Sequence, residues 1–151
     1  MRAAASLAIV LIAALVLPAC DRWDVVGPGR GFEGDYTYAG TVDHEFGDAV
    51  IGSLFITRQR GGRAYVDIDW EYLDRGVSVI RIVSDEAAIA DIDRDGFIAF
   101  DFEGDLFIDG ARTFFRLTHD GRLRGRTLTG EWRLDTDLPT NDRGTFTAHR
   151  E

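Results

Sequence analysis

The sequence predicts an all-β fold, an antiparallel meander of about eight to ten strands that closes as a small barrel. From about Gly34 onward, apolar and polar residues alternate with the period of a strand that has one dry and one wet face. Turn signals rich in Gly and Asp separate these segments. A β-sandwich is the alternative, because both arrangements hide strand edges that would otherwise invite aggregation.

The strands follow from this alternation, and the clearest one covers residues 63–72. Its apolar face carries Ala64, Val66, Ile68, Trp70 and Tyr72, and its polar face carries Asp67, Asp69 and Glu71. The other strands are expected at residues 35–42, 49–59, 77–83, 87–92, 97–108, 112–119, 123–134 and 145–150. A single helical turn could begin in residues 84–90.

Glycine has two roles in this prediction. Hairpin turns are expected at Arg60-Gly61-Gly62, Asp74-Arg75-Gly76, Asp109-Gly110 and Asp120-Gly121, because Asp and Gly tolerate tight turns. Glycines expected within strands, where they would let a barrel bend at its corners, are Gly40, Gly52, Gly104, Gly125 and Gly130. These internal glycines favour a closed barrel over a flat sheet.

Composition excludes several classes of protein. The chain has 151 residues, 26 acidic and 17 basic, with a formal net charge of -9 and one cysteine. One cysteine rules out a disulfide scaffold and a zinc-ribbon cluster. All basic residues are Arg, so there is no lysine to form a Schiff base. The acidic balance argues against nucleic acid as a partner.

The N-terminus reads as an export signal. Residues 3–19 form an uncharged apolar run after Arg2. The run ends in Leu17-Pro18-Ala19-Cys20, which resembles the lipobox of bacterial lipoproteins. The resemblance implies that residues 1–19 are a signal peptide and that lipid on the Cys20 sulfur holds the protein to a membrane outside the cytoplasm. Secretory cleavage without lipid, an uncleaved anchor and a core helix remain alternatives.

The domain plan follows from this resemblance. Residues 20–33 are expected to be the lipidated cysteine and a flexible tether, since they contain Gly27, Pro28 and Gly29. Residues 34–151 are expected to be the barrel domain. Asp21 follows the cysteine, and its similarity to a retention signal of some Gram-negative envelopes favours the inner membrane, with the outer membrane as the alternative.

The two ends of the barrel weakly resemble those of lipocalins and their calycin relatives. Those proteins have Gly-x-Trp early and an arginine late in the barrel. This chain has Gly34-Asp35-Tyr36 early and Arg150 late, whereas its own Gly-x-Trp is Gly130-Glu131-Trp132. The resemblance concerns architecture and implies no activity.

One local pattern could bind calcium. Asp91, Asp93 and Asp95 alternate ahead of Gly96, as in the first half of a calcium loop. The twelfth position of such a loop, which should be acidic, is Phe102. A plain hairpin over residues 93–96 is therefore favoured, and no other cofactor is expected.

No catalytic motif is found, so the protein is expected not to be an enzyme. His44, His119 and His149 are expected at exposed loops or strand ends, and none has the spacing of metal ligands. There is no Gly-x-Ser-x-Gly elbow for a nucleophile. The carboxylates of residues 67–71 are expected to keep the domain soluble.

The aromatic residues leave two functions open. They are Trp70, Tyr72, Phe100, Phe102, Phe114, Phe115 and Trp132. They could line a cavity for a small apolar ligand, which makes the protein a lipid-anchored binding module. They could equally fill the barrel, which is the commoner role of large apolar side chains, and the protein would then dock an envelope protein.

Overall fold

The computed structural model describes residues 31–43, 48–58, 63–108, 110–137 and 142–151. In these residues it contains nine antiparallel strands and no helix. Consequently, no helix in this part of the chain is long and apolar enough to cross a membrane. The strands are β1 (Gly34–Thr41), β2 (Ala49–Arg58), β3 (Arg63–Asp74), β4 (Val77–Val83), β5 (Ala88–Ile92), β6 (Phe97–Ile108), β7 (Ala111–Arg124), β8 (Thr127–Thr136) and β9 (Asp142–Arg150).

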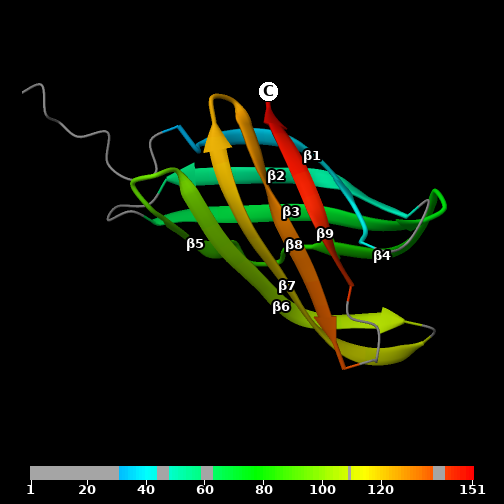
Figure 1. Ribbon diagram of the computed structural model, residues 1–151. Coiled ribbons are helices and arrows are strands. Elements are labelled where there is room, and N and C mark those ends of the chain that lie inside the picture. Colours follow the sequence, from blue (N-terminus) through cyan, green and yellow to red (C-terminus); the bar gives the residue numbers. More distant parts are fainter. Residues whose placement is uncertain (1–30, 44–47, 59–62, 109, 138–141) are drawn as a thin grey trace, which may run out of the picture.

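Eight of the strands form a closed barrel (Figure 1). The sheet has the order β2-β1-β9-β8-β7-β6-β5-β3-β4, and the additional pairing of β2 with β3 closes the ring. Strand β4 lies outside this ring and pairs only with β3. The barrel prediction is therefore confirmed, and the alternative of a two-sheet sandwich is wrong.

Strands β4 and β5 share one edge of β3. β4 pairs with the second half of β3, from Asp69 onward, and β5 pairs with its first residues, up to Val66. Between them Ser84 binds the backbone of Ile68: its N–H donates to the Ile68 carbonyl (2.9 Å), and its hydroxyl accepts the Ile68 N–H (3.0 Å). The segment after β4 is thus a bend held to β3, and the expected helical turn is wrong.

Strand β6 is paired on both sides only at its start. Its contact with β5 consists of two residue pairs, Asp91 with Ala99 and Ile92 with Ile98. From Phe100 onward β6 pairs with β7 alone. The hairpin of β6 and β7 therefore extends beyond the ring, and its tip lies apart from β4 (Figure 1).

The turn expected at Asp120-Gly121 is wrong. Both residues lie within β7, where Gly121 pairs with Ile98 on one side and Gly130 on the other. The actual turn comes after Arg124, where Gly125 has a φ of 64° and so is not a strand residue. The expected strands at 112–119 and 123–134 are replaced by one long β7 and by β8.

The internal glycines mark close contacts between strands. A Cβ on Gly130 would lie 1.9 Å from the Asp120 carbonyl oxygen and 2.6 Å from the Gly121 Cα. A Cβ on Gly52 would lie 2.0 Å from the Asp69 carbonyl oxygen. Only glycine fits such positions, which supports the prediction that glycines allow the sheet to curve.

The chain is fastened at the end of the barrel where β1 begins and β9 ends. Tyr36 and Arg150, the residues that carry the lipocalin resemblance, are partners across β1 and β9. The Tyr36 hydroxyl donates to the Phe32 carbonyl (2.8 Å), and the Arg150 guanidinium donates to the Gly31 carbonyl (2.6 Å). These bonds hold the buried Phe32 ring at that end of the barrel.

Candidate functional site

A small polar cluster lies inside the barrel among aromatic rings. Tyr38 on β1 and His119 on β7 meet there, with 3.2 Å between the Tyr38 hydroxyl and His119 Nε2. Both residues are almost completely buried, with 2% and 1% of their surface exposed. The alternation of β7, which turns Phe115, Leu117 and His119 to the same side, brings the histidine into the interior.

This position of His119 contradicts the expectation of an exposed strand end. The error has the same origin as the false turn, because ending the strand at Asp120-Gly121 made His119 its last residue. His149 is exposed and lies 3.2 Å from the Thr127 hydroxyl through Nδ1. His44 lies outside the described residues.

The cluster carries no charge at neutral pH. Burial lowers the pKa of His119 to about 3, so its imidazole is neutral. Burial also raises the pKa of the Tyr38 hydroxyl, and the nearby Trp70 indole N–H only partly opposes this shift. The His119 ring stacks on Phe100, with 4.8 Å between ring centroids, and meets the edge of Phe146 at 5.4 Å.

Two nitrogen atoms of this interior have no hydrogen-bond partner. They are Nδ1 of His119 and the indole Nε1 of the completely buried Trp70, which lies near the Tyr38 hydroxyl but is not aligned with it as a hydrogen-bond donor. Trp132 differs, because its indole N–H donates to the Thr41 carbonyl (3.0 Å). A buried polar group without a partner typically costs about 1–3 kcal/mol of stability. Most buried polar groups in native proteins have a hydrogen-bond partner, so these two nitrogen atoms mark this part of the interior as a candidate ligand site.

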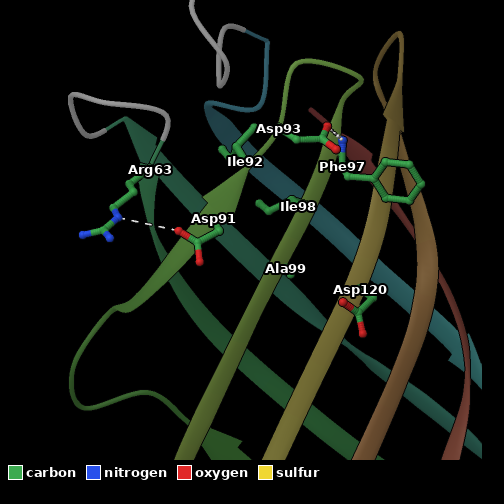
Figure 2. Close-up of a pocket in the computed structure, with 8 residues that line it drawn as sticks. All are labelled: Arg63, Asp91, Ile92, Asp93, Phe97, Ile98, Ala99 and Asp120. Atoms are coloured by element: carbon green, nitrogen blue, oxygen red, sulfur yellow. Dashed lines mark hydrogen bonds and ion pairs between the residues drawn. The ribbon is translucent and has the colours of Figure 1, made fainter.

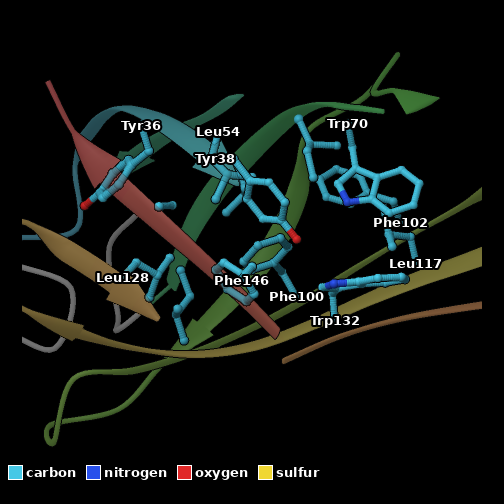
Figure 3. Packing of buried hydrophobic residues seen from close by; sticks show 14 of the residues in the cluster. Tyr36, Tyr38, Leu54, Trp70, Phe100, Phe102, Leu117, Leu128, Trp132 and Phe146 are labelled. Atoms are coloured by element: carbon cyan, nitrogen blue, oxygen red, sulfur yellow. The ribbon is translucent and has the colours of Figure 1, made fainter. Parts of the chain in front are cut away.

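Large rings surround Tyr38 (Figure 3). Trp70 and Trp132 lie edge to face with 5.4 Å between ring centroids, and so do Phe100 and Phe102 at 5.9 Å. Phe146 stacks on Tyr38 at 5.0 Å. Sequence reasoning selected both tryptophans and Phe100 but missed Tyr38 and Phe146, although each lies on the apolar side of an alternating strand.

The predicted aromatic set needs one correction. Trp70, Tyr72, Phe100, Phe102, Phe115 and Trp132 are buried in the described core. Phe114 is 43% exposed, because it follows the opposite side of β7 from its buried neighbour Phe115. Adjacent residues of a strand point to opposite faces, so the two cannot both line the interior.

The predicted calcium loop forms the hairpin turn between β5 and β6. The Asp93 carboxylate accepts the backbone N–H groups of Asp95 and Phe97, each at 2.9 Å, and Gly96 has a φ of 82°. Asp91 instead lies 3.6 Å from Arg63 across the strands. In the described part of the chain no group of three or more His, Cys, Asp or Glu residues could hold a metal ion. This geometry favours the hairpin interpretation, and the calcium site at Asp91, Asp93 and Asp95 stays a prediction.

Beside this turn lies an open surface depression of about 520 Å³ (Figure 2). It is lined by Arg63, Asp91, Ile92, Asp93, Phe97, Ile98, Ala99 and Asp120. The side chain of Asp91 is 83% exposed, and the Arg122 guanidinium covers the Phe97 ring from 4.6 Å. The lining combines exposed charged side chains with the buried Ile92 and Ile98.

The outward carboxylates of β3 carry ion pairs. Asp69 binds Arg81 of β4 through two hydrogen bonds of 3.0 and 2.7 Å. These bonds lower the pKa of Asp69. Cys20, the predicted lipid attachment site, and Asp21 lie outside the described residues.

Fold and site together define a small antiparallel β-barrel with an aromatic interior and an uncharged polar cluster. Comparison with known proteins identifies the fold alone. No family model matches the chain, and no curated protein matches it.

Solved structures with a similar fold include two barrels. EF1p2_mFAP2b bound to DFHBI has a TM-score of 0.57 and 10% sequence identity, over 79% of this chain and 93% of that chain. A redesigned beta barrel, mFAP1, bound to DFHBI, has a TM-score of 0.53 and 12% identity, over 78% of this chain and 94% of that chain.

Proposed function

We propose that this protein is a lipid-anchored, extracytoplasmic β-barrel that binds a small, mostly apolar molecule in its interior and catalyses no reaction. The observation that carries the binding role is the pair of unpartnered nitrogens, Trp70 Nε1 and His119 Nδ1, inside an aromatic interior. Ligand sites are typically apolar pockets with a few polar groups that orient the ligand. The two similar barrels, each bound to DFHBI, support the same role.

The side wall formed by β6 offers a route into the interior. Phe100 and Phe102 lie beside the cluster, on the part of β6 that pairs with β7 alone. Moving this segment outward breaks no backbone bonds to β4 or β5, because neither strand pairs with it. Displacement of these two rings by a ligand requires this segment to move together with β7 or to break its pairs with β7.

Titration with DFHBI tests binding. We expect DFHBI to change the fluorescence of the interior tryptophans and to raise Tm, since a molecule that binds only the folded state stabilises it. Phe100→Leu should weaken binding, whereas the matched variant Phe107→Leu, whose parent side chain is 76% exposed, should leave it unchanged. Equal effects of the two variants would place the DFHBI site outside the barrel and contradict the proposal.

The anchor is proposed from the Leu17-Pro18-Ala19-Cys20 motif. Mass spectrometry of the mature N-terminus should find an acylated Cys20 in the native chain and none in Cys20→Ser. The native protein should also sediment with membranes, and the variant should lose that association. An intact Met1, or an unmodified thiol on a soluble chain, would overturn the anchoring and the proposed location.

Docking of an envelope protein is a second candidate, favoured by the free edge of β4. Val77, Val79 and Val83 are 65%, 51% and 56% exposed on this strand. An extended partner segment could add to the edge as a further strand. A photocrosslinking residue in place of Val79 should then yield one discrete adduct in intact cells, and the same residue in place of the exposed Glu131 should not. Identical patterns at both positions would exclude this candidate.

A further inference from the structure

We propose that the ligand of the barrel is a planar aromatic molecule with an uncharged hydrogen-bond acceptor, such as a ketone oxygen, which receives the indole N–H of Trp70. This inference rests on the proposed function and specifies the chemistry of the same interior site. It follows from the kind of polar atom that lacks a partner, from the absence of buried charge and from the arrangement of the rings.

The polar atom is a donor. An indole nitrogen donates one hydrogen bond and accepts none. The Trp70 indole N–H is buried without a well-aligned hydrogen bond, although it lies close enough to the Tyr38 hydroxyl to lower the pKa of that group. The corresponding group of Trp132 is already bonded to Thr41. Because the Trp70 N–H is already buried, a hydrogen bond to a ligand oxygen costs no further desolvation of this donor. An apolar isostere of the ligand would leave the N–H without that hydrogen bond. The site should therefore discriminate between two ligands of the same shape.

The acceptor must be uncharged. Thr113 and His119 are the only buried polar or charged residues among those described, so the interior holds no cation. A carboxylate would lose its hydration there and find no counter-charge. A ketone, aldehyde or ester oxygen accepts the indole N–H without that cost.

The rings favour a flat partner. His119 and Phe100 are nearly parallel, with 14° between their planes, and so are Tyr38 and Phe146. A planar ligand can replace a displaced phenyl ring in such a stack, because offset stacking is a preferred arrangement of aromatic groups. Nδ1 of His119 remains for a second polar group of the ligand.

A matched pair of probes tests this chemistry. 2-Acetylnaphthalene carries a ketone oxygen, and 2-isopropenylnaphthalene has a methylene group in its place. By calorimetric titration we expect the ketone to bind about 10-fold more tightly, which corresponds to one hydrogen bond regained by a buried donor. Trp70→Phe should remove this preference, and Trp132→Phe should retain it.

A spectroscopic measurement covers the case in which Trp70→Phe does not fold. In nitrogen-15 NMR spectra of the native protein, the ketone should shift the Trp70 indole proton downfield, and the isopropenyl probe should not. The Trp132→Phe spectrum assigns the two interior indole signals. Equal affinities and no ketone-specific indole shift would overturn the proposed ligand chemistry while the binding role stands. Failure of both naphthalenes and of DFHBI to bind would overturn the binding role itself.

Discussion

His119 links the interior of the barrel to its stability in acid. Histidine has an ordinary pKa of about 6.5, and burial lowers the pKa of His119 to about 3. The folded state therefore resists protonation of this ring. The stability that the neutral ring contributes is complete above pH 6.5 and is lost as the pH falls from about 6.5 toward about 3.

His119→Gln should flatten that dependence. We expect the free energy of unfolding of the native protein to fall between pH 6.5 and 4 more steeply than that of the variant, by at most about 1.4 kcal/mol per pH unit. Urea denaturation across this range measures both slopes. The exposed His149 provides a matched His→Gln control outside the interior. The lowered pKa of Asp69 acts mainly below about pH 4 and is common to all three proteins.

Gly130 tests the close contact of β7 and β8. A methyl group there would collide with the Asp120 carbonyl oxygen, 1.9 Å away, which belongs to the backbone and cannot rotate aside. We expect Gly130→Ala to lower the free energy of unfolding by about 3 kcal/mol or more. Gly76→Ala should cost only about 1 kcal/mol, since Gly76 has a φ of 85° but open space around it. If both variants lose a similar free energy of unfolding in urea denaturation, the close contact between β7 and β8 is not the reason why position 130 requires glycine.

At the scale of single residues, sequence predicts which side chains are buried better than it predicts what they contact. The period of two in β3 correctly turns Trp70 inward. The hydrogen-bonding contact between Tyr38 and His119 joins residues that are 81 positions apart, and it depends on which strands become neighbours. The lack of a partner for the Trp70 indole depends on the same three-dimensional packing and has no signal in the sequence.

The longest edges that lack a second neighbouring strand belong to β4 and to β6 from Phe100 onward. Strand β8 pairs with β7 and β9 along nearly its whole length, whereas β4 pairs only with β3. An edge strand leaves part of its N–H groups to solvent. Hydrogen exchange should therefore be faster in residues 77–83 and 100–108 than in β8, as measured by NMR or by mass spectrometry of peptides. Uniform protection across these elements would mean that both edges are covered in solution.

The turn between β5 and β6 depends on Asp93. Its carboxylate satisfies two backbone N–H groups, and we expect Asp93→Ala to lower the free energy of unfolding by about 1–2 kcal/mol. Asp95→Ala is the matched control and should have little effect. If the turn has only this structural role, millimolar calcium leaves Tm unchanged. An upward shift of Tm that disappears in Asp93→Ala would instead establish the calcium site.

Element positions were predictable where alternation and turn chemistry agree. The Asp74-Arg75-Gly76 turn is an example, because Arg75 and Gly76 both adopt positive φ there. The Asp120-Gly121 pair has the same local signal but lies within a strand, since Gly121 is needed opposite Gly130 where β7 and β8 meet. Local turn propensity and strand packing select the same residue types, so the sequence alone does not separate them.

For the whole molecule, the closed barrel was predictable because many short antiparallel strands must hide their edges. The exclusion of β4 from the ring was not, because it depends on how β4 and β5 divide the edge of β3. In the described part of the chain no Asp, Glu or Arg is buried, so its charges lie on the outer surface, where several Arg–Asp and Arg–Glu pairs partly neutralise one another. Surface pairs of this kind contribute little to stability and mainly shape the electrostatic field.

Hydrogen bonds from Tyr36 of β1 and Arg150 of β9 hold Phe32 and Gly31, so the chain enters the barrel at one defined end. The chain reaches β1 at the end that carries the β5–β6 and β7–β8 turns, and the tip of the β6–β7 hairpin lies at the opposite end (Figure 1). The proposed lipid on Cys20 would therefore attach the barrel through this end. The hairpin tip and the start of β4 lie at the end farthest from that attachment, where a partner could reach them without contacting the tether.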